Sequence, residues 1–142
     1  MRRAALALIA VAVVAACGSD PVEVTADDYL DDLESICTDT AATLEALPEP
    51  PEQITVADFA TSAASALDNE AERARSLNVP DELDADHRAF IRNTDEQATA
   101  WRAVAGAGDD LNDLTVRIGE LIRGRNDLVE EMGAPACRRG EV

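Results

Sequence analysis

The chain has 142 residues, of which 29 are acidic and 12 are basic, and its formal net charge is −17. All of the basic residues are Arg. So acidic a chain has little means of displacing counterions from phosphates, and we therefore exclude a general nucleic-acid binder. The length suits a single domain.

The N-terminus carries an export pattern. Two Arg residues follow Met1, and residues 4–14 are apolar without interruption. This run is too short to span a hydrocarbon core of ~30 Å as a helix, but it fits the apolar part of a signal peptide. It ends in Val-Ala-Ala-Cys over residues 14–17. These features resemble a bacterial lipoprotein signal, whose lipobox is a branched aliphatic residue, two small residues and Cys.

The resemblance implies that residues 1–16 are removed and that Cys17 carries the lipid. The protein would then be anchored at the extracytoplasmic face of the cell membrane, with residues 17–24 as a short lipidated tether. The alternative is an ordinary secretory signal, cleaved after Ala16, which leaves Cys17 free.

Export also predicts how the other two cysteines are used. An exported chain meets an oxidising compartment, and once Cys17 is lipidated only Cys37 and Cys137 remain. We therefore predict that these two form a disulfide. A bridge that closes so long a loop stabilises a fold by about 4–5 kcal/mol in the chain-entropy model. Metal ligation is the alternative for this pair, but no CxxC spacing supports it.

Apolar residues at gaps of three and four predict four helices, over 26–47, 56–77, 81–104 and 110–132. The helices have similar lengths and short connections. They therefore predict an all-α fold, an up-down-up-down four-helix bundle over residues 25–137 with one disulfide, followed by a C-terminal tail over 138–142.

The expected helix ends have ordinary capping residues. Thr25 and Thr55 each precede a helix and have Asp three residues further on. Pro80 suits the first turn of the third helix, Asp109 or Asp110 is the expected N-cap of the fourth, and Gly133 is its expected C-cap.

One cysteine in the first helix and a terminal Gly-x-Pro-x-Cys over 133–137 complete the pattern. The mature chain is thereby similar to small helical lipoproteins of high-GC Gram-positive bacteria. This resemblance implies no particular activity.

Catalytic motifs are missing from the sequence. His87 is the single histidine, no Gly-x-Ser-x-Gly elbow is present, and no Gly-rich loop has the Lys of a phosphate site. Asp84 and His87 resemble one Glu-x-x-His unit of a di-metal bundle, but such sites need two units. The acids of the first helix and of residues 81–86 would at most bind Ca²⁺ weakly, and a solvated acidic face is the simpler interpretation. We expect no enzyme, no cofactor and no metal site.

Three ionisable residues interrupt the apolar stripes of three helices: Glu70, His87 and Arg125. Each lies six or seven residues from the same end of the predicted bundle, so we place them in one buried polar layer. Because an unpaired buried charge is costly, we predict that Arg125 is buried and pairs with Glu70. Such a layer fixes the register of the helices or forms a ligand-binding or proton-sensing site; in a third interpretation, Arg125 extends to solvent.

These observations favour a lipid-anchored, extracytoplasmic, non-catalytic binding or scaffolding module at the cell envelope. It contacts the membrane through the lipid on Cys17, and its acidic surface favours cationic partners such as a basic protein segment or peptide. The alternative function is a carrier of a small ligand or metal ion that uses the polar layer between the helices.

Overall fold

The computed structural model describes residues 24–50, 53–107 and 111–140. The lipobox with Cys17 and the candidate caps Asp109 and Asp110 lie outside these ranges. Four α-helices follow one another: α1 (Ala26–Glu45), α2 (Val56–Arg75), α3 (Asp84–Gly106) and α4 (Asn112–Met132). Two short 3-10 turns, η1 (Asp81–Leu83) and η2 (Pro135–Cys137), precede α3 and follow α4. The described residues contain no strand, and the predicted all-α fold is confirmed.

The starts of α1 and α2 and the end of α4 form where their capping residues predict them, whereas α1 and α2 each end two residues earlier than predicted and α3 begins three residues later. The hydroxyl oxygens of Thr25 and Thr55 accept hydrogen bonds from the backbone N–H of Asp28 and Asp58, at 3.1 and 3.0 Å. Each hydroxyl in turn donates to the carboxylate of the same Asp at 2.7 Å. These reciprocal bonds satisfy donors that the first helical turn leaves without partners. Gly133 ends α4 in the left-handed region, at φ 83°, where a side chain would be strained.

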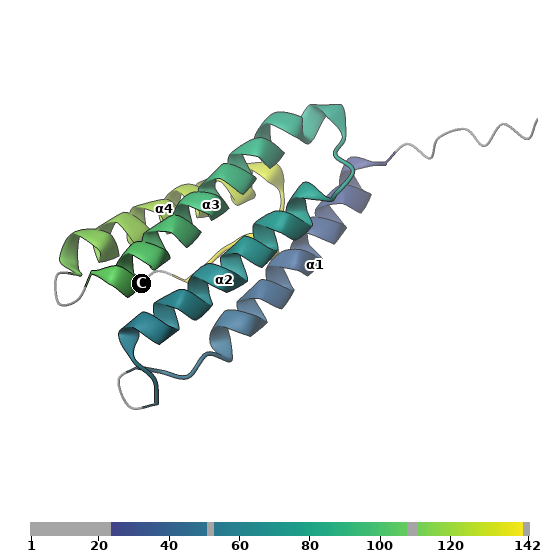
Figure 1. Cartoon of the computed structure of the whole chain (residues 1–142). Coiled ribbons are helices and arrows are strands. Elements are labelled where there is room, and N and C mark those ends of the chain that lie inside the picture. Colours follow the sequence, from purple (N-terminus) through teal and green to yellow (C-terminus); the bar gives the residue numbers. More distant parts are fainter. Residues whose placement is uncertain (1–23, 51–52, 108–110, 141–142) are drawn as a thin grey trace, which may run out of the picture.

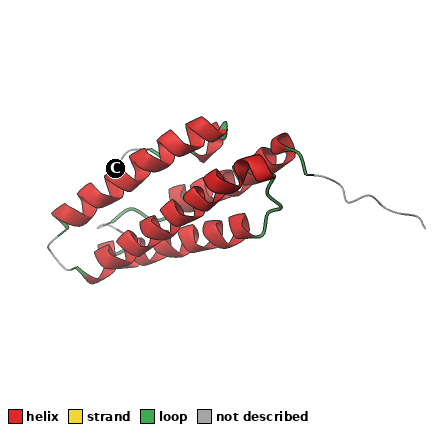
Figure 2. Ribbon diagram, turned by 90° about the horizontal axis from the view of Figure 1, so that it is seen from above, coloured by secondary structure: helices red, strands yellow, loops and turns green. Residues whose placement is uncertain are grey.

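The helices form a bundle in which α1 and α4 are not packed closely on each other (Figure 1). Helix α2 packs on α3, α3 packs on α4, and α1 packs on α2. Between α1 and α4 the packing is different, because the other main contacts of α1 are with η2 rather than with α4. The C-terminal segment, yellow in Figure 1, runs back between the α1–α2 pair and the α3–α4 pair. The four helices lie along a common direction when the bundle is seen from above (Figure 2).

The core is divided into two clusters. One contains Tyr29, Leu33, Phe90, Val129 and Met132 together with the two cysteines, and the other contains Ala60, Ala100, Val104, Ile118 and Ile122. Glu70, Thr94, Gln97 and Arg125 are also buried. Many of the buried positions in α2 and α3 are Ala, which allows close helix packing but buries little apolar area at each position. The core is therefore thin for a bundle of this size.

No helix in the described ranges is both long enough and apolar enough to cross a membrane.

Candidate functional site

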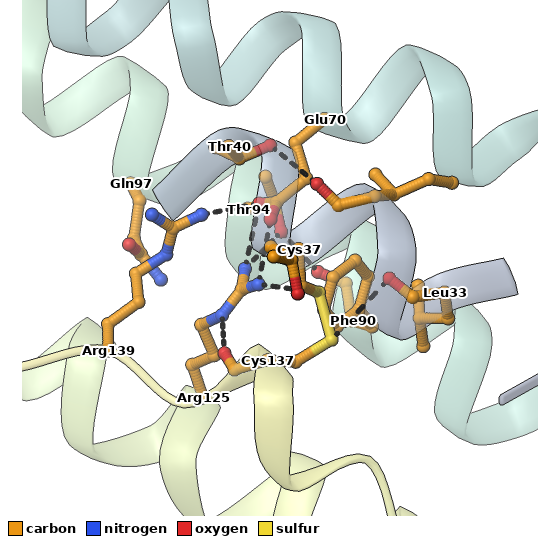
Figure 3. Close-up of polar contacts among 12 residues, drawn as sticks. Leu33, Cys37, Thr40, Glu70, Phe90, Thr94, Gln97, Arg125, Cys137 and Arg139 are labelled. Atoms are coloured by element: carbon orange, nitrogen blue, oxygen red, sulfur yellow. Dashed lines mark hydrogen bonds and ion pairs between the residues drawn. A yellow bond between two sulfur atoms is a disulfide. The ribbon is translucent and has the colours of Figure 1, made fainter. Parts of the chain in front are cut away.

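Glu70 of α2 and Arg125 of α4 form a bidentate ion pair in the middle of the bundle (Figure 3). The Nη1 and Nη2 atoms of Arg125 donate to the two carboxylate oxygens of Glu70 at 3.0 and 2.9 Å. Both side chains are buried, with exposed fractions of 1% for Arg125 and 0% for Glu70. The structure thus places these two predicted residues in direct contact and excludes the alternative in which Arg125 extends to solvent.

Each N–H of the Arg125 guanidinium has a partner. Nε donates to the backbone carbonyl of Cys137 at 2.9 Å, and Nη1 also donates to the hydroxyl of Thr94 at 2.9 Å. The second Nη2 donor meets the sulfur of Cys37 at 3.5 Å, and the Phe90 ring lies 4.4 Å from the guanidinium carbon. Burial lowers the pKa of Arg125 to about 10, against the opposing effect of Glu70, so the group stays charged at neutral pH.

A disulfide joins Cys37 of α1 to Cys137 of η2, as predicted. Their Cα atoms are 4.9 Å apart, and 100 residues separate them in the sequence. Since the two sulfur atoms are bonded to each other, the pair offers no thiolate to a metal ion. The bridge also fixes the carbonyl of Cys137 that accepts the hydrogen bond from Arg125.

The C-terminal segment belongs to the folded core and extends further than predicted. The amide side chain of Asn126 on α4 exchanges two hydrogen bonds with the backbone of Arg139, at 2.8 and 2.9 Å. Glu34 of α1 accepts a hydrogen bond from the backbone N–H of Ala136 at 2.9 Å. The bundle boundary placed at Cys137 is therefore at least two residues too early, and Arg139 belongs inside it.

Arg139 adds a second cation to the buried pair. Its Nη2 donates to an oxygen of Glu70 at 2.7 Å, and 11% of its side chain is exposed. Its Nε is shielded from solvent and has no hydrogen-bond partner among the described residues. Glu70, Thr94, Arg125 and Arg139, which we call the Glu70 cluster, therefore contain one carboxylate and two guanidinium groups.

His87 lies outside the Glu70 cluster, which corrects the predicted three-residue layer. Its Nδ1 is 2.9 Å from the hydroxyl of Tyr29, and the two rings meet edge to face. An ion pair places Arg75, the last residue of α2, opposite Asp95 of α3. His87 comes eight residues before Asp95, or about 12 Å nearer the start of α3. The prediction was wrong because the first turns of α3 extend beyond the end of α2. Residues at equal numbers of positions from their helix ends therefore do not lie at the same level along the bundle axis.

A crevice of about 260 Å³ opens beside the Glu70 cluster. All four helices and the C-terminal segment line it, and it lies where that segment reaches Gly140. The shape follows from the fold, because the segment separates α1 from α4. The apolar wall is formed by Leu44, Phe59, Leu67, Trp101 and Ile122, and the polar residues of the lining are Glu45, Gln97, Arg138 and Arg139.

The features considered for a metal ion do not form a metal site. Asp84 pairs with Arg88 at 2.6 Å, and the His87 ring is hydrogen-bonded to Tyr29. The described ranges contain no group of three or more His, Cys, Asp or Glu side chains that could hold a metal ion. The Glu70 cluster itself repels cations, because its two guanidinium groups outnumber its single carboxylate. Charge and donor chemistry therefore favour an anion rather than a metal ion beside this cluster.

Sequence reasoning missed several residues of this site. Thr94 interrupts the apolar stripe of α3, as Glu70 interrupts that of α2, and this signal was available. Arg139 had no such signal, because a tail residue has no helical period that relates it to the core. Asn126 lies in α4 but outside the apolar stripe of that helix. The crevice depends on the path of the tail, which no local pattern reveals.

Comparisons with protein-family models, with curated proteins and with solved structures find no match for this chain. Function must therefore be argued from the chemistry of the site itself.

Proposed function

We propose that the protein is a non-catalytic binding module, lipid-anchored at the extracytoplasmic face of the cell membrane, and that the crevice is its ligand site. The crevice carries this proposal, because it combines an apolar wall from four helices with a few polar groups in its lining. Small-molecule sites are typically concave and apolar in this way. Their volumes are ~300–1,000 Å³, so a volume of about 260 Å³ suits a ligand smaller than a drug-sized molecule.

This proposal retains the binding of a small ligand that the sequence suggested, but it places the ligand in the crevice rather than in the polar layer between the helices. Within the Glu70 cluster, the donors of Arg125 are already used by Glu70 and Thr94 and by groups outside the cluster. It therefore supports the crevice rather than holding the ligand inside the layer. A lipid on Cys17 would keep the bundle near the bilayer, because a tether over 17–24 reaches roughly 25 Å when extended.

Scaffolding of a cationic partner is a second candidate, favoured by the exposed acids near the start of α1. Six exposed carboxylates there and in η1 form no ion pair with a described residue: Asp27, Asp28, Asp31, Asp32, Asp81 and Glu82. A basic peptide would be attracted to this end of the bundle, and added salt would weaken its binding. The crevice is the better supported site, because it has a defined shape as well as charge.

The chain supplies its own reporter for the crevice. Trp101 is its only tryptophan and lines the apolar wall. We expect the neutral probe N-phenyl-1-naphthylamine to change Trp101 emission in a saturable way. Ala41→Phe, at a half-buried position of the lining, should fill the space and weaken probe binding at least tenfold.

The matched control is Ala42→Phe, the same substitution at the next residue of α1, which is exposed and does not line the crevice. It should bind the probe like the wild type. Equal binding by wild type and both variants, or no binding by a folded wild type, would contradict the proposal.

A further inference from the structure

We propose that the ligand of the crevice is a small amphiphile with a carboxylate head, and that Arg139 recognises the head. This inference rests on the proposed function and adds the ligand's chemical class. It follows from the charges and donors in the lining of the crevice and from the apolar residues along its wall.

The charge balance beside the crevice favours an anion. Glu70 accepts hydrogen bonds from both Arg125 and Arg139, so a single carboxylate faces two guanidinium groups. Every N–H of Arg125 is used within the protein. The excess positive charge therefore lies on Arg139, which is the guanidinium of the cluster that lines the crevice.

Arg139 also has a donor to offer. Its Nη2 is held by Glu70, and its Nε is shielded from solvent, but 11% of the side chain stays exposed, so part of the guanidinium is accessible from the crevice that it lines. A carboxylate oxygen accepts a hydrogen bond from the accessible part, and a charge-assisted hydrogen bond is about twice as strong as a neutral one. An alcohol satisfies the same donor without matching the charge, and an ammonium group supplies no acceptor.

The backbone of Arg139 is held so that its side chain is positioned before a ligand arrives. Asn126 exchanges two hydrogen bonds with it, and the disulfide fixes Cys137 two residues earlier. An ordered side chain loses little entropy on binding. The fixed tail therefore makes Arg139 a specificity residue rather than a loose surface charge.

The wall of the crevice defines the rest of the ligand. Phe59 and Trp101 meet edge to face, with ring centroids 5.7 Å apart, and Leu67 and Ile122 are buried beside the same space. These side chains suit a short alkyl or aryl group. Glu45, an exposed residue of the lining, is the one acid that opposes the head.

Three probes with one chain length test this inference: octanoate, octanol and octylammonium. Trp101 emission reports occupancy by each in the whole mature domain. We expect octanoate to bind at least tenfold more tightly than octanol, with octylammonium the weakest. Equal affinities, or a preference for octylammonium, would overturn the carboxylate assignment while leaving the crevice a site. If none of the three binds and N-phenyl-1-naphthylamine also fails, the proposed function itself is wrong.

Variants separate recognition by Arg139 from a general effect on the fold. Arg139→Gln should lower the preference for octanoate over octanol to about twofold or less, because Gln keeps a neutral donor for either head group but loses the charge. Arg75→Gln is the matched control, because Arg75 is exposed, pairs with Asp95 and does not line the crevice. It should keep the full preference, and an equal loss in both variants would contradict the assignment. Should Arg139→Gln fail to fold, Glu45→Gln provides the second test, with octanoate affinity raised about two- to threefold.

A carboxylate of the chain itself is the competing occupant that the test must separate. Glu141 comes two residues after Arg139 in the sequence. The variant Glu141→Gln removes this anion. Octanoate affinity within about threefold of the wild type supports an external ligand. A gain of tenfold or more would identify Glu141 as the native occupant and overturn the proposal.

Discussion

Arg139, near the end of the chain, donates to the carboxylate of Glu70, which is completely buried in α2 and also holds Arg125. The pair of cations around one anion sets the energetics of the core. Removing the shared carboxylate leaves two guanidinium groups without it, whereas removing either cation leaves Glu70 with the other. The three residues should therefore contribute unequally to the stability of the fold, although each takes part in an ion pair.

We predict that Glu70→Leu is the most destabilising single substitution in this cluster. It should lower the free energy of unfolding by about 3–5 kcal/mol, because it leaves Arg125 buried and without a counter-ion. Arg125→Leu should cost less, since Arg139 still neutralises Glu70. Urea unfolding of the disulfide-bonded domain measures both values.

Replacing both Glu70 and Arg125 by Leu should recover part of the free energy of unfolding that is lost in the single variants, because no unpaired charge of this pair is then left buried. Full recovery is not expected, because Arg139 still loses its partner. A double-mutant cycle gives the coupling directly. Additive effects, or Arg125→Leu costing more than Glu70→Leu, would contradict the shared-carboxylate arrangement.

Reduction of the disulfide should destabilise the domain by about 2–5 kcal/mol, because the bridge closes a loop of 100 residues. Under native, unreduced conditions Cys37 and Cys137 should resist alkylation. Reduction should also free the tail, so Arg139 amide exchange should accelerate. Asn126→Ala, which removes both hydrogen bonds to the Arg139 backbone, should produce the same local acceleration with the disulfide intact. Unchanged exchange in both cases would mean that the tail is held by other contacts.

The Tyr29–His87 contact should make stability depend on pH below neutrality. Burial lowers the pKa of His87 below 6.5, against an opposing effect of Asp84, and raises the pKa of Tyr29 to about 12. The unfolded chain therefore takes up a proton at His87 before the folded chain does. Stability is complete above the unfolded pKa of about 6.5 and falls as the pH drops toward the lower folded pKa.

His87→Gln tests this dependence, because Gln keeps a hydrogen-bonding group near Tyr29 but does not titrate there. Unfolding measured between pH 7.5 and 5 should show a smaller loss of stability in the variant than in the wild type. Identical slopes would mean that His87 keeps an ordinary pKa, and that the loss comes from the carboxylates.

The lipid anchor has its own test. Cys17→Ser should leave the precursor without lipid and move the protein out of the membrane fraction, because the described helices offer no other membrane span. Wild-type protein found free in the culture fluid with an unmodified Cys17 would contradict the lipoprotein assignment.

Local physics explains why so much of the fold could be predicted. Thr25, Thr55 and Gly133 cap helices through bonds within a few residues of themselves, so the sequence carries that information directly. The Glu70–Arg125 contact was predictable because two opposite charges in apolar stripes must find each other. The height of His87 was not, since it depends on how the turn between α2 and α3 crosses the end of the bundle.

The crevice could not be predicted from the periodic pattern of apolar residues in the sequence. It exists because the segment after Gly133 turns back and lies between α1 and α4, held there by the disulfide and by Asn126. These are contacts between residues far apart in sequence, which a pattern of apolar residues along one helix does not specify. Arg139 enters the core by the same route.

The claim that the crevice holds a carboxylate on Arg139 is tested most directly by the side-chain N–H signals of ¹⁵N-labelled protein. Arg139→Gln assigns the Nε–H signal of Arg139, and the indole N–H belongs to Trp101, the only tryptophan. On titration with octanoate, both signals should shift together and saturate, while octanol should shift the indole signal and leave the Arg139 signal much less changed. An Arg139 Nε–H signal that stays in place while octanoate binds, or shifts confined to residues outside the crevice, would contradict the account.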